Sequence, residues 1–368
     1  MSKGMVVVGL SGGVDSSAAA YLLHKQGYDV VGITMQIWQN EEQAAVEENG
    51  GCCGLSAVED ARRVASQIGI PHYVVNFRDI FRETVIDDFV SEYRQGRTPN
   101  PCIRCNRYVK WEALLDKALS IGADYIATGH YARIVHLENG RYAIALSASM
   151  RKDQTYALYN LTQFQLSHTL MPLGGLDKPA VRKAAEEAGL YVARKPDSQD
   201  ICFVPDGNYG AFIESYTGQK AQPGRFVTKD GQVIGESKGI TAYTIGQRKG
   251  LGLAMGHPVF VTQIRPETNE VVIGENEDLF SRELYASHVN MMAAEALTEP
   301  VRCLGKVRYT QKMAPCTASQ TEDGRLHIIF DEPQRAITPG QSAVLYTEEG
   351  AVLGGGIIEA GTQPYAHN

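Results

Sequence analysis

The chain has 368 residues, of which 43% are hydrophobic and 21% charged, and its formal net charge is −7. The length indicates two or three domains, and the acidic balance does not favour a protein built mainly to bind nucleic acid, although a local basic groove is compatible with it. No apolar run is long enough to span a bilayer and no signal-peptide pattern opens the chain, so we expect a cytoplasmic protein without a membrane partner. Seven cysteines are too few for a disulfide framework at this length, so we expect mostly reduced thiols.

Short apolar segments alternate with helical segments over residues 1–205, which is the pattern of a parallel sheet covered by helices. The predicted strands are Met5–Leu10, Val30–Met35, His72–Asn76 and Tyr125–Gly129. The predicted helices are Asp15–Gln26, Ala57–Ile68, Ile80–Gln95, Arg107–Ser120 and Pro179–Ala188. Two further segments, Arg133–Leu137 and Arg141–Leu146, flank a Glu-Asn-Gly turn and predict a hairpin. The predicted fold class of this part is α/β.

The chain becomes glycine-rich and β-like near residue 206, where Asp230-Gly231 predicts a hairpin turn. From about His288 to Glu359, β-rich segments are separated by predicted breaks at Asp323-Gly324, Glu332-Pro333 and Pro339-Gly340, which indicates a small closed or nearly closed β domain. We therefore predict a catalytic domain over residues 1–205, a small β-rich central domain over 206–280 and a barrel-like domain over 281–368. The polar residues 40–51 predict a mobile loop.

The segment Ser11–Ser16 follows the first predicted strand directly and opens the first predicted helix. This order aims backbone N–H groups and the positive end of a helix at one point, which suits a phosphate. Gly12 and Gly13 let the backbone approach an anion closely, the serine hydroxyls can donate hydrogen bonds, and Asp15 can help to hold Mg²⁺. No Lys-Ser/Thr pair follows the glycines and the Gly-x-Gly-x-x-Gly spacing is absent, so this is neither a Walker A nor a dinucleotide loop. The alternative is an N-capped helix after a tight turn, without a ligand.

A second motif, Cys102-Ile103-Arg104-Cys105, lies in Gly96–Asn106, where two prolines predict an extended, exposed loop. Neighbouring arginines can stabilise a thiolate, as a nucleophile or a metal ligand requires. The alternatives are two buried cysteines that act as small hydrophobes, or half of a zinc site, for which no second Cys or His pair is present.

Cys202 lies in Asp197–Phe203 and taken alone indicates only an ordinary buried cysteine. Its loop and the Cys102–Cys105 loop can meet over the carboxyl ends of the strands, where such sheets bind ligands. The segment Ile126–Tyr131 ends a predicted strand at the same edge, and places Gly129 and His130 there. A lone histidine is usually structural, so a substrate role and a structural role for His130 both stay open.

The segment Ser11–Ser16 resembles the PP-loop of the ATP pyrophosphatases, which split ATP between the α and β phosphates. Further segments follow in the same order as in one family: GRTPNPCIRCN, ATGHYAR, KDQTYALY, DSQDICF, TIGQRKGLG and TPGQSAV. Over residues 9 to about 345 the chain is thereby similar to the tRNA-specific 2-thiouridylases (tRNA-uridine 2-sulfurtransferases). This resemblance implies an adenine-nucleotide alpha-hydrolase-like domain, then the central β domain and a C-terminal β-barrel that binds tRNA. It implies an enzyme that adenylates O2 of the wobble uridine and replaces this oxygen with sulfur from a cysteine persulfide, releasing AMP and pyrophosphate.

The resemblance also assigns roles to individual residues. Cys105 matches the catalytic nucleophile, and Cys202 matches the cysteine that carries the persulfide. The positions that match the ATP site are Gly9, Leu10, Ser11, Gly12, Gly13, Val14, Asp15 and Ser16, with Met35 and Gly129 beside the adenine and ribose. The positions that match contacts to the target base are Asn100, Pro101 and Cys102. The positions that match other contacts to tRNA are His130, Lys152, Asp153, Gln154, Arg308, Tyr309 and Gln341.

One departure concerns Cys102, because many members of the family have Asp at this position. The thiols of Cys102, Cys105 and Cys202 could ligate a 4Fe–4S cluster with one iron open to sulfide. The same thiols could instead run a persulfide and disulfide relay without a metal. The sequence leaves both mechanisms open.

The implied partners are ATP with Mg²⁺, wobble-uridine tRNAs such as those for Lys, Glu and Gln, and a cysteine desulfurase or sulfur-relay carrier as donor. We expect a monomer. One rival function is another PP-loop ATP pyrophosphatase, such as an amidotransferase-type synthetase, although residue 2 is Ser rather than a Cys nucleophile. Another is a non-catalytic tRNA-binding iron–sulfur protein, which would have no use for an intact ATP loop. We expect Cys303 and Cys316 to serve packing, and Cys52 and Cys53 to be incidental.

Overall fold

A computed structural model describes residues 2–37, 55–196 and 201–360 of the chain. The chain divides into two compact units, which are described one at a time. Unit 1 comprises residues 1–86, 101–206 and 350–352, and unit 2 comprises 87–100, 207–349 and 353–368. The polar segment 40–51 and the pair Cys52 and Cys53 lie outside the described residues.

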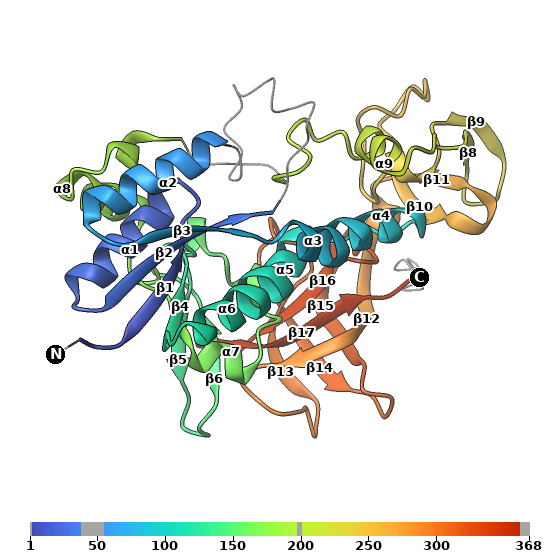
Figure 1. The fold of residues 1–368 in the computed structure, drawn as a ribbon. Coiled ribbons are helices and arrows are strands. Elements are labelled where there is room, and N and C mark those ends of the chain that lie inside the picture. The colour runs from blue at the N-terminus through green and yellow to red at the C-terminus, as the bar shows by residue number, and fades with distance from the viewer. Residues whose placement is uncertain (1, 38–54, 197–200, 361–368) are drawn as a thin grey trace. The chain divides into compact units, whose positions relative to one another are not determined.

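Unit 1 is built on a five-stranded sheet with the spatial order β3-β2-β1-β4-β7, in which every pairing is parallel (Figure 1). Its strands are β1 (Met5–Gly9), β2 (Asp29–Gln36), β3 (His72–Asn76), β4 (Tyr125–Ala127) and β7 (Thr169–Leu170). The predicted hairpin is also present, as β5 (Arg133–His136) paired with β6 (Tyr142–Ala145). β2 and β3 lie on one side of β1, and β4 and β7 lie on the other, so the strand order changes direction at β1. In open parallel sheets, ligands bind at such a switch point.

Helices cover the sheet of unit 1, and α1, α2 and α8 begin and end within two residues of their predicted bounds. The helices of unit 1 are α1 (Val14–Lys25), α2 (Leu55–Ile68), α3 (Arg78–Phe81), η2 (Arg82–Ile86), α5 (Pro101–Arg104), η3 (Cys105–Ala113), α6 (Leu114–Ser120), η4 (Met150–Lys152), η5 (Thr155–Leu158), α7 (Gln163–Ser167), α8 (Lys178–Glu187) and η6 (Tyr191–Arg194). In α8, Asp177 caps the first turn by accepting from the Ala180 N–H at 2.9 Å, and Pro179 stands in that turn as predicted.

The core of unit 1 follows from the strand sequences. Val6, Val7 and Val8 are each 0% exposed, as expected for a strand that is buried on both faces of a parallel sheet. Three successive alanines of α1, Ala18–Ala20, are also fully buried, and they join clusters that include residues of β1, α2 and α8. Small side chains let these elements approach closely, so α1, which carries the Ser11–Ser16 segment at its start, is held on several sides.

Two segments of unit 1 differ from the sequence predictions. The helix predicted over Ile80–Gln95 is interrupted by a π-helical segment, η2, before α4 (Asp87–Arg94) begins in unit 2. The extended loop predicted over Gly96–Asn106 is wrong from Pro101 onward, because Pro101 starts α5 and Cys105 starts the π-helical segment η3. The N–H groups of the first helical turn have no partner within the helix, so the missing N–H of proline costs no hydrogen bond there. The φ of proline also suits a helix, so Pro101 can start this element.

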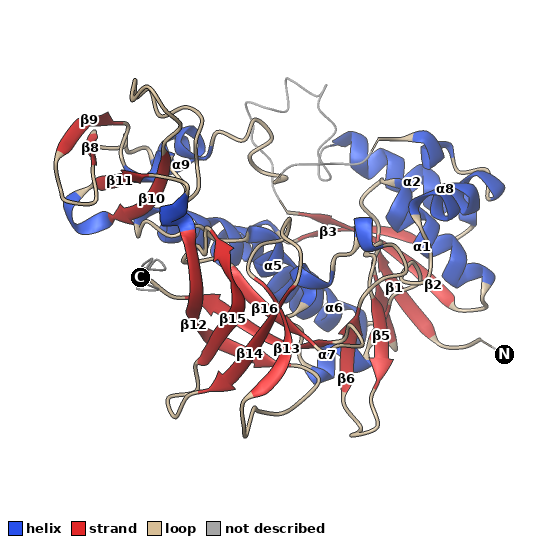
Figure 2. Ribbon diagram, turned by 180° about the vertical axis from the view of Figure 1, so that it is seen from behind, coloured by secondary structure: helices blue, strands red, loops and turns tan. Residues whose placement is uncertain are grey.

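Unit 2 contains a four-stranded sheet and a closed barrel, whose strands are red in Figure 2. The sheet has the order β10-β11-β8-β9, from β8 (Gly224–Val227), β9 (Val233–Ser237), β10 (Phe260–Arg265) and β11 (Glu270–Gly274). The predicted turn at Asp230-Gly231 joins β8 to β9. The helical elements of unit 2 besides α4 are α9 (Tyr209–Thr217), η7 (Ile240–Ala242), η8 (Pro266–Thr268) and η9 (Glu277–Leu279).

The barrel closes in the order β12-β15-β14-β13-β16-β17, which confirms the predicted closed β domain. Its strands are β12 (Phe280–Met291), β13 (Val301–Lys306), β14 (Ala314–Gln320), β15 (Leu326–Arg335), β16 (Ser342–Tyr346) and β17 (Val352–Ile358). Cys303 and Cys316 pair directly across β13 and β14, are buried, and have their sulfurs 3.6 Å apart. Their environment agrees with the packing role expected of them.

One predicted break in the barrel is wrong. Glu332-Pro333 lies inside β15, whereas the other two breaks separate strands. The pairing of β12 with β15 shifts between Ser281, opposite Gln334, and Glu283, opposite Ile329. Proline cannot donate to a ladder, and it is tolerated here because the regular pairing skips its position. Among the described residues, no helix has the length and apolar character needed to cross a bilayer.

Candidate functional site

The Ser11–Ser16 segment forms a tight loop between β1 and α1. The Leu10 N–H donates to the Ile33 carbonyl at 2.8 Å, which ties the start of the loop to β2. The Ser11 and Ser16 hydroxyl oxygens lie 3.1 Å apart, and the Ser16 hydroxyl donates to the Gly13 carbonyl at 3.2 Å. Gly13 is the N-cap of α1, and no side chain of the described residues caps this helix. The first turn of α1 therefore keeps the N–H groups and the positive dipole end that suit an anion.

The other side of the switch point is formed by the turn after β4. A Cβ at Gly129 would lie 2.6 Å from the Ser16 nitrogen and 2.7 Å from the Asp15 carbonyl carbon, so the two turns are in backbone contact. Met35, near the end of β2, has its terminal carbon 3.9 Å from the ideal Cβ position of Gly9. The structure thus brings Met35, Gly129 and the Ser11–Ser16 loop to one edge of the sheet.

Asp15, in the first turn of α1, is held by two side chains that the sequence analysis did not identify. The Lys178 ammonium lies 2.8 and 2.9 Å from its two carboxylate oxygens, and the Tyr131 hydroxyl donates to it at 2.7 Å. Lys178 is the first residue of α8, so the Asp177 cap and Pro179 that set the start of this helix also place the ammonium. The only sequence signal for Lys178 was this helix start.

The segment Lys152–Gln154, which is predicted to contact tRNA, is linked to the Ser11–Ser16 loop through Tyr131. The side-chain oxygen of Gln154 accepts a hydrogen bond from the Tyr131 N–H at 2.9 Å, and the Gln154 N–H donates to the Tyr131 carbonyl at 3.1 Å. Asp153 is buried and accepts hydrogen bonds from the Ser147 N–H and the Thr155 hydroxyl. Lys152 is half-buried. Asp153 and Gln154 therefore fix the turn that carries Tyr131 toward Asp15.

The Cys102–Cys105 segment starts a helix rather than lying in a loop. Cys102 is exposed and Cys105 is half-buried, so neither is the fully buried hydrophobe of the alternative reading. Arg104 donates to the Thr84 carbonyl at 3.1 Å, and its guanidinium carbon lies 4.6 Å from the centre of the Tyr108 ring. This arginine therefore anchors the start of η3 to the segment η2.

Cys202 is exposed, and the next residue anchors it to the same part of unit 1. Phe203 is buried and packs edge-on against Phe81, with the ring centres 5.7 Å apart. Phe81 ends α3 and Thr84 belongs to η2, which follows α3 directly. Each of the two cysteines thus has a neighbouring side chain fixed to Arg78–Ile86, a common base that the sequence did not reveal.

The cysteines of the described residues are not in disulfides. Within that part of the chain, no three His, Cys, Asp or Glu side chains are grouped so that they could hold a metal ion. Cys102, Cys105 and Cys202 all belong to this part of the chain, so as arranged here they do not form a group around a single metal ion.

His130 lies beside Trp111, with ring centres 5.5 Å apart, and its Nδ1 is 2.7 Å from the Thr128 hydroxyl. Burial, with a smaller effect of the Lys110 charge, holds the pKa of His130 well below its usual value. The ring is therefore neutral near pH 7, so it can donate or accept a hydrogen bond but does not attract a phosphate by charge.

In unit 2, Gln341 fixes the backbone just ahead of the Cys102 segment. Its side-chain amide donates to the carbonyls of Thr98 and Pro99 at 2.8 and 3.3 Å, and the Thr98 N–H donates to the Pro339 carbonyl at 2.8 Å. Asn100, which is half-buried, follows this anchored stretch. Gln341 thus positions the chain that leads into Asn100-Pro101.

Arg308 and Tyr309, also in unit 2, differ in what they offer a ligand. Arg308 donates to the carbonyls of Ile245 and Ala336 and to the Thr338 hydroxyl, so it holds three parts of unit 2 together. Tyr309 is 42% exposed, and the Lys306 ammonium lies 5.5 Å from the centre of its ring. An exposed ring beside a cation suits a nucleotide, through base stacking and phosphate attraction.

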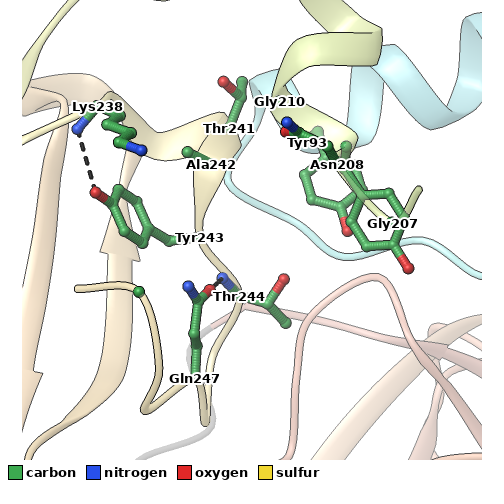
Figure 3. Close-up of a pocket in the computed structure, with 12 residues that line it drawn as sticks. Tyr93, Gly207, Asn208, Gly210, Lys238, Thr241, Ala242, Tyr243, Thr244 and Gln247 are labelled. Atoms are coloured by element: carbon green, nitrogen blue, oxygen red, sulfur yellow. Dashed lines mark hydrogen bonds between the residues drawn. The ribbon is translucent and has the colours of Figure 1, made fainter. Parts of the chain in front are cut away.

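A polar pocket of about 320 Å³ lies within unit 2 (Figure 3). Tyr93 of α4, Asn208 and the segment 238–250 contribute to its lining. The Tyr243 hydroxyl accepts from the Lys238 N–H at 3.2 Å, and Gln247 accepts from the Thr244 N–H at 3.0 Å. Burial raises the pKa of Tyr93, so its hydroxyl stays protonated near pH 7. None of the predicted site residues lines this pocket.

Three family models match the chain: a tRNA methyl transferase HUP domain over residues 4–206, a tRNA methyl transferase PRC-barrel domain over 210–275 and an aminomethyltransferase beta-barrel domain over 281–358. The chain is 60% identical to the tRNA-specific 2-thiouridylase MnmA of Lachnoclostridium phytofermentans, over 96% of this chain and 99% of that one. The chain belongs to the tRNA-specific 2-thiouridylase family. The predicted resemblance and the predicted three-part fold class are thereby confirmed.

The tRNA-specific 2-thiouridylase MnmA of Clostridium perfringens is 56% identical, over 98% of this chain and 99% of that one. Among solved structures, a 4-thiouridine synthetase in complex with RNA and ATP has a TM-score of 0.37 and 19% identity, over 56% of this chain and 46% of that one. Membership of the family rests on the two close relatives and on the model that matches residues 4–206.

Proposed function

We propose that this protein replaces O2 of the wobble uridine of tRNA with sulfur at the expense of ATP. The observation that carries this proposal is the 60% identity to a tRNA-specific 2-thiouridylase over 96% of the chain. The loop between β1 and α1 supports it, because this loop has the geometry of a phosphate site and is the part that ATP would need.

In the first half-reaction, the uridine oxygen attacks the α phosphate of ATP and pyrophosphate leaves. We assign ATP to Gly9–Ser16, with Met35 and Gly129 beside the adenine and ribose. Backbone N–H groups at the start of α1 would stabilise the negative charge of the phosphates. Proteins usually bind Mg²⁺ through one or two carboxylates together with the phosphates of the substrate. Asp15 is the carboxylate of this loop, so it could bind the Mg²⁺ that accompanies ATP. Asp15 now pairs with Lys178, whose ammonium supplies positive charge at the same place.

In the second half-reaction, the adenylated oxygen is a good leaving group. The terminal sulfur of a persulfide on Cys202 attacks C2, and AMP departs with the original oxygen. Cys105 then attacks the Cys202 sulfur, which forms a Cys105–Cys202 disulfide and releases the second sulfur as 2-thiouridine. Reduction of the disulfide by a dithiol resets the enzyme. The anchoring of both segments to Arg78–Ile86 supports this assignment.

We assign the target base to Asn100, Pro101 and Cys102, and further tRNA contacts to His130, Lys152–Gln154, Arg308, Tyr309 and Gln341. The base must leave the anticodon stack to be reached. Among these residues Tyr309 has the exposure and the neighbouring cation that a direct contact requires. Asp153, Gln154, Arg308 and Gln341 make structural hydrogen bonds, so they would act on tRNA by positioning the backbone around them. We propose tRNAs for Lys, Glu and Gln as substrates.

We further propose a monomer of the cytoplasm that takes its sulfur from a cysteine desulfurase or a sulfur-relay carrier. The absence of disulfides among the cysteines of the described residues supports a reducing compartment. We keep the predicted division into residues 1–205, 206–280 and 281–368 as the working domain boundaries.

The experiment that tests the function combines the purified protein with ATP, Mg²⁺, a persulfide donor and unmodified tRNA. Digestion of the tRNA and mass spectrometry of its nucleosides should reveal 2-thiouridine formed in step with AMP. AMP formation with ammonia or another acceptor in place of tRNA would instead indicate an amidotransferase-type synthetase. Binding of tRNA without AMP formation would indicate a non-catalytic protein.

The mechanism without a cluster makes a separate prediction. Protein that is purified and assayed without oxygen should be colourless, contain less than about one-tenth of an iron per chain, and be fully active. The reason is that the relay proposed above uses only the thiols of Cys202 and Cys105 and an external dithiol, and needs no iron. The measurement is an anaerobic absorption spectrum with iron and sulfide analysis. Activity that rises in proportion to bound iron would support the 4Fe–4S alternative.

A further inference from the structure

Lys195 makes a contact with the ATP loop that the function proposed above does not use. Its ammonium donates to the Gly12 carbonyl at 3.3 Å and to the Asp60 carboxylate at 2.6 Å. The Gly12–Gly13 peptide is planar, and in a trans peptide the C=O and the following N–H point in opposite directions. A hydrogen bond that holds the Gly12 carbonyl on one side therefore directs the Gly13 N–H to the other side.

Asp60 is itself fixed where α2 meets the loop. A Cβ at Gly12 would lie 2.5 Å from the Ala57 carbonyl oxygen and 2.9 Å from the Asp60 Cβ, so the loop rests directly on α2. The Tyr191 hydroxyl donates a hydrogen bond to Asp60, and the Arg63 guanidinium carbon lies 4.7 Å from the centre of the Tyr191 ring. Burial alone would raise the pKa of Asp60, but the hydrogen bonds from Lys195 and Tyr191 and the nearby cations outweigh it and lower the pKa.

The backbone that carries Lys195 is held as well. Arg182 of α8 donates to the Ala193 carbonyl at 2.6 Å and to the Lys195 carbonyl at 3.0 Å. The side chains of Lys195 and Asp60 are 32% and 23% exposed, which places the pair at the margin of the loop rather than in open solvent. Lys195 is therefore fixed at its backbone by α8 and at its ammonium by α2.

We propose that Lys195, held by Asp60, is a positioning residue that orients the Gly12–Gly13 peptide for binding the phosphates of ATP. This inference rests on the proposed function, since it takes ATP as the ligand of the loop. The ammonium acts through the loop backbone and its charge is already neutralised by Asp60. Loss of Asp60 should therefore weaken ATP binding. If Lys195 instead bound a phosphate directly, loss of Asp60 would release its charge and ATP binding would stay equal or improve.

The test measures the ATP affinity of the full-length protein by calorimetry with ATP and Mg²⁺. We expect Lys195→Met to weaken binding about 10- to 100-fold, the range for a lost charge-assisted hydrogen bond, and Asp60→Asn to weaken it in the same direction. Both should leave the affinity for tRNA within about twofold. The Asp60→Asn/Lys195→Met double variant should bind ATP no more weakly than Lys195→Met, because both residues act through one pair.

The matched control is Arg194→Met, which removes a positive charge from the residue next to Lys195. The Arg194 side chain is 91% exposed. This variant should leave ATP affinity unchanged. Tyr191→Phe, which removes only the hydroxyl on Asp60, provides a milder variant if Lys195→Met does not fold. The proposal is overturned if Lys195→Met or Tyr191→Phe binds ATP like the parent, or if Asp60→Asn binds ATP as tightly as the parent or more tightly. A parent protein without ATP affinity would overturn both this inference and the proposed function, whereas parent binding with unchanged variants overturns the inference alone.

Discussion

Replacing the exposed thiol in Cys202→Ser should lower the rate of 2-thiouridine formation to below about one-thousandth of the parent rate, as expected when a covalent group is removed from a mechanism that depends on it. A serine oxygen cannot carry a persulfide, so no sulfur would reach C2. Adenylation should persist, because the loop between β1 and α1, to which we assign ATP, does not include Cys202. The measurement follows 2-thiouridine by mass spectrometry and pyrophosphate release in the same reaction.

Two further variants sharpen this prediction. Cys303→Ala removes a buried barrel thiol that serves packing and is outside the proposed relay, and it should thiolate tRNA at the parent rate. Cys105→Ser should stop the reaction one step later, with tRNA joined to the protein through the Cys202 persulfide sulfurs and released by a reducing agent. Thiolation by Cys202→Ser at more than a few per cent of the parent rate would show that another group delivers the sulfur.

Gly12→Ala should weaken ATP binding by at least about 10-fold, because it misplaces one N–H donor of a preorganised anion site, and removal of one such donor from an oxyanion hole lowers kcat by about 10²–10³-fold. Gly12 has φ of +69°, and an added Cβ would lie 2.5 Å from the Ala57 carbonyl oxygen. Backbone cannot yield as a flexible side chain would, so the loop must move away from α2. Calorimetry with ATP and Mg²⁺ measures the effect, and tRNA affinity should not change.

Gly27→Ala is the matched control for this substitution. Gly27 has φ of +92°, and nothing lies within 4 Å of its ideal Cβ position. Both variants therefore impose the left-handed strain of alanine, about 1–2 kcal/mol, but only Gly12→Ala also creates a backbone clash. Equal ATP affinity of the two variants would mean that the loop does not depend on its contact with α2.

The parts of the fold that were predicted well are those whose pattern is contained in a short stretch of chain. The strand Met5–Gly9, the glycine loop and the helix from Val14 lie within about twenty residues, and apolar runs and glycines specify each of them. Pro179 marked the start of α8 for the same reason. The wrong predictions also have local causes: the prolines of Gly96–Asn106 predict an extended loop although Pro101 starts a helix, and Glu332-Pro333 predicts a break although it lies within β15.

The sequence by itself determined the family, through its ordered motifs, and it predicted a phosphate-binding loop at Ser11–Ser16 and the candidate cysteines. Only the tertiary structure decided how this loop is held. Asp15 pairs with Lys178, 163 residues away, and Gly12 accepts a hydrogen bond from Lys195, 183 residues away. It also decided that the Cys105 and Cys202 segments share the base Arg78–Ile86. The physical reason is that hydrophobic periodicity encodes local structure, whereas pairing between distant polar side chains depends on how the helices pack on the sheet.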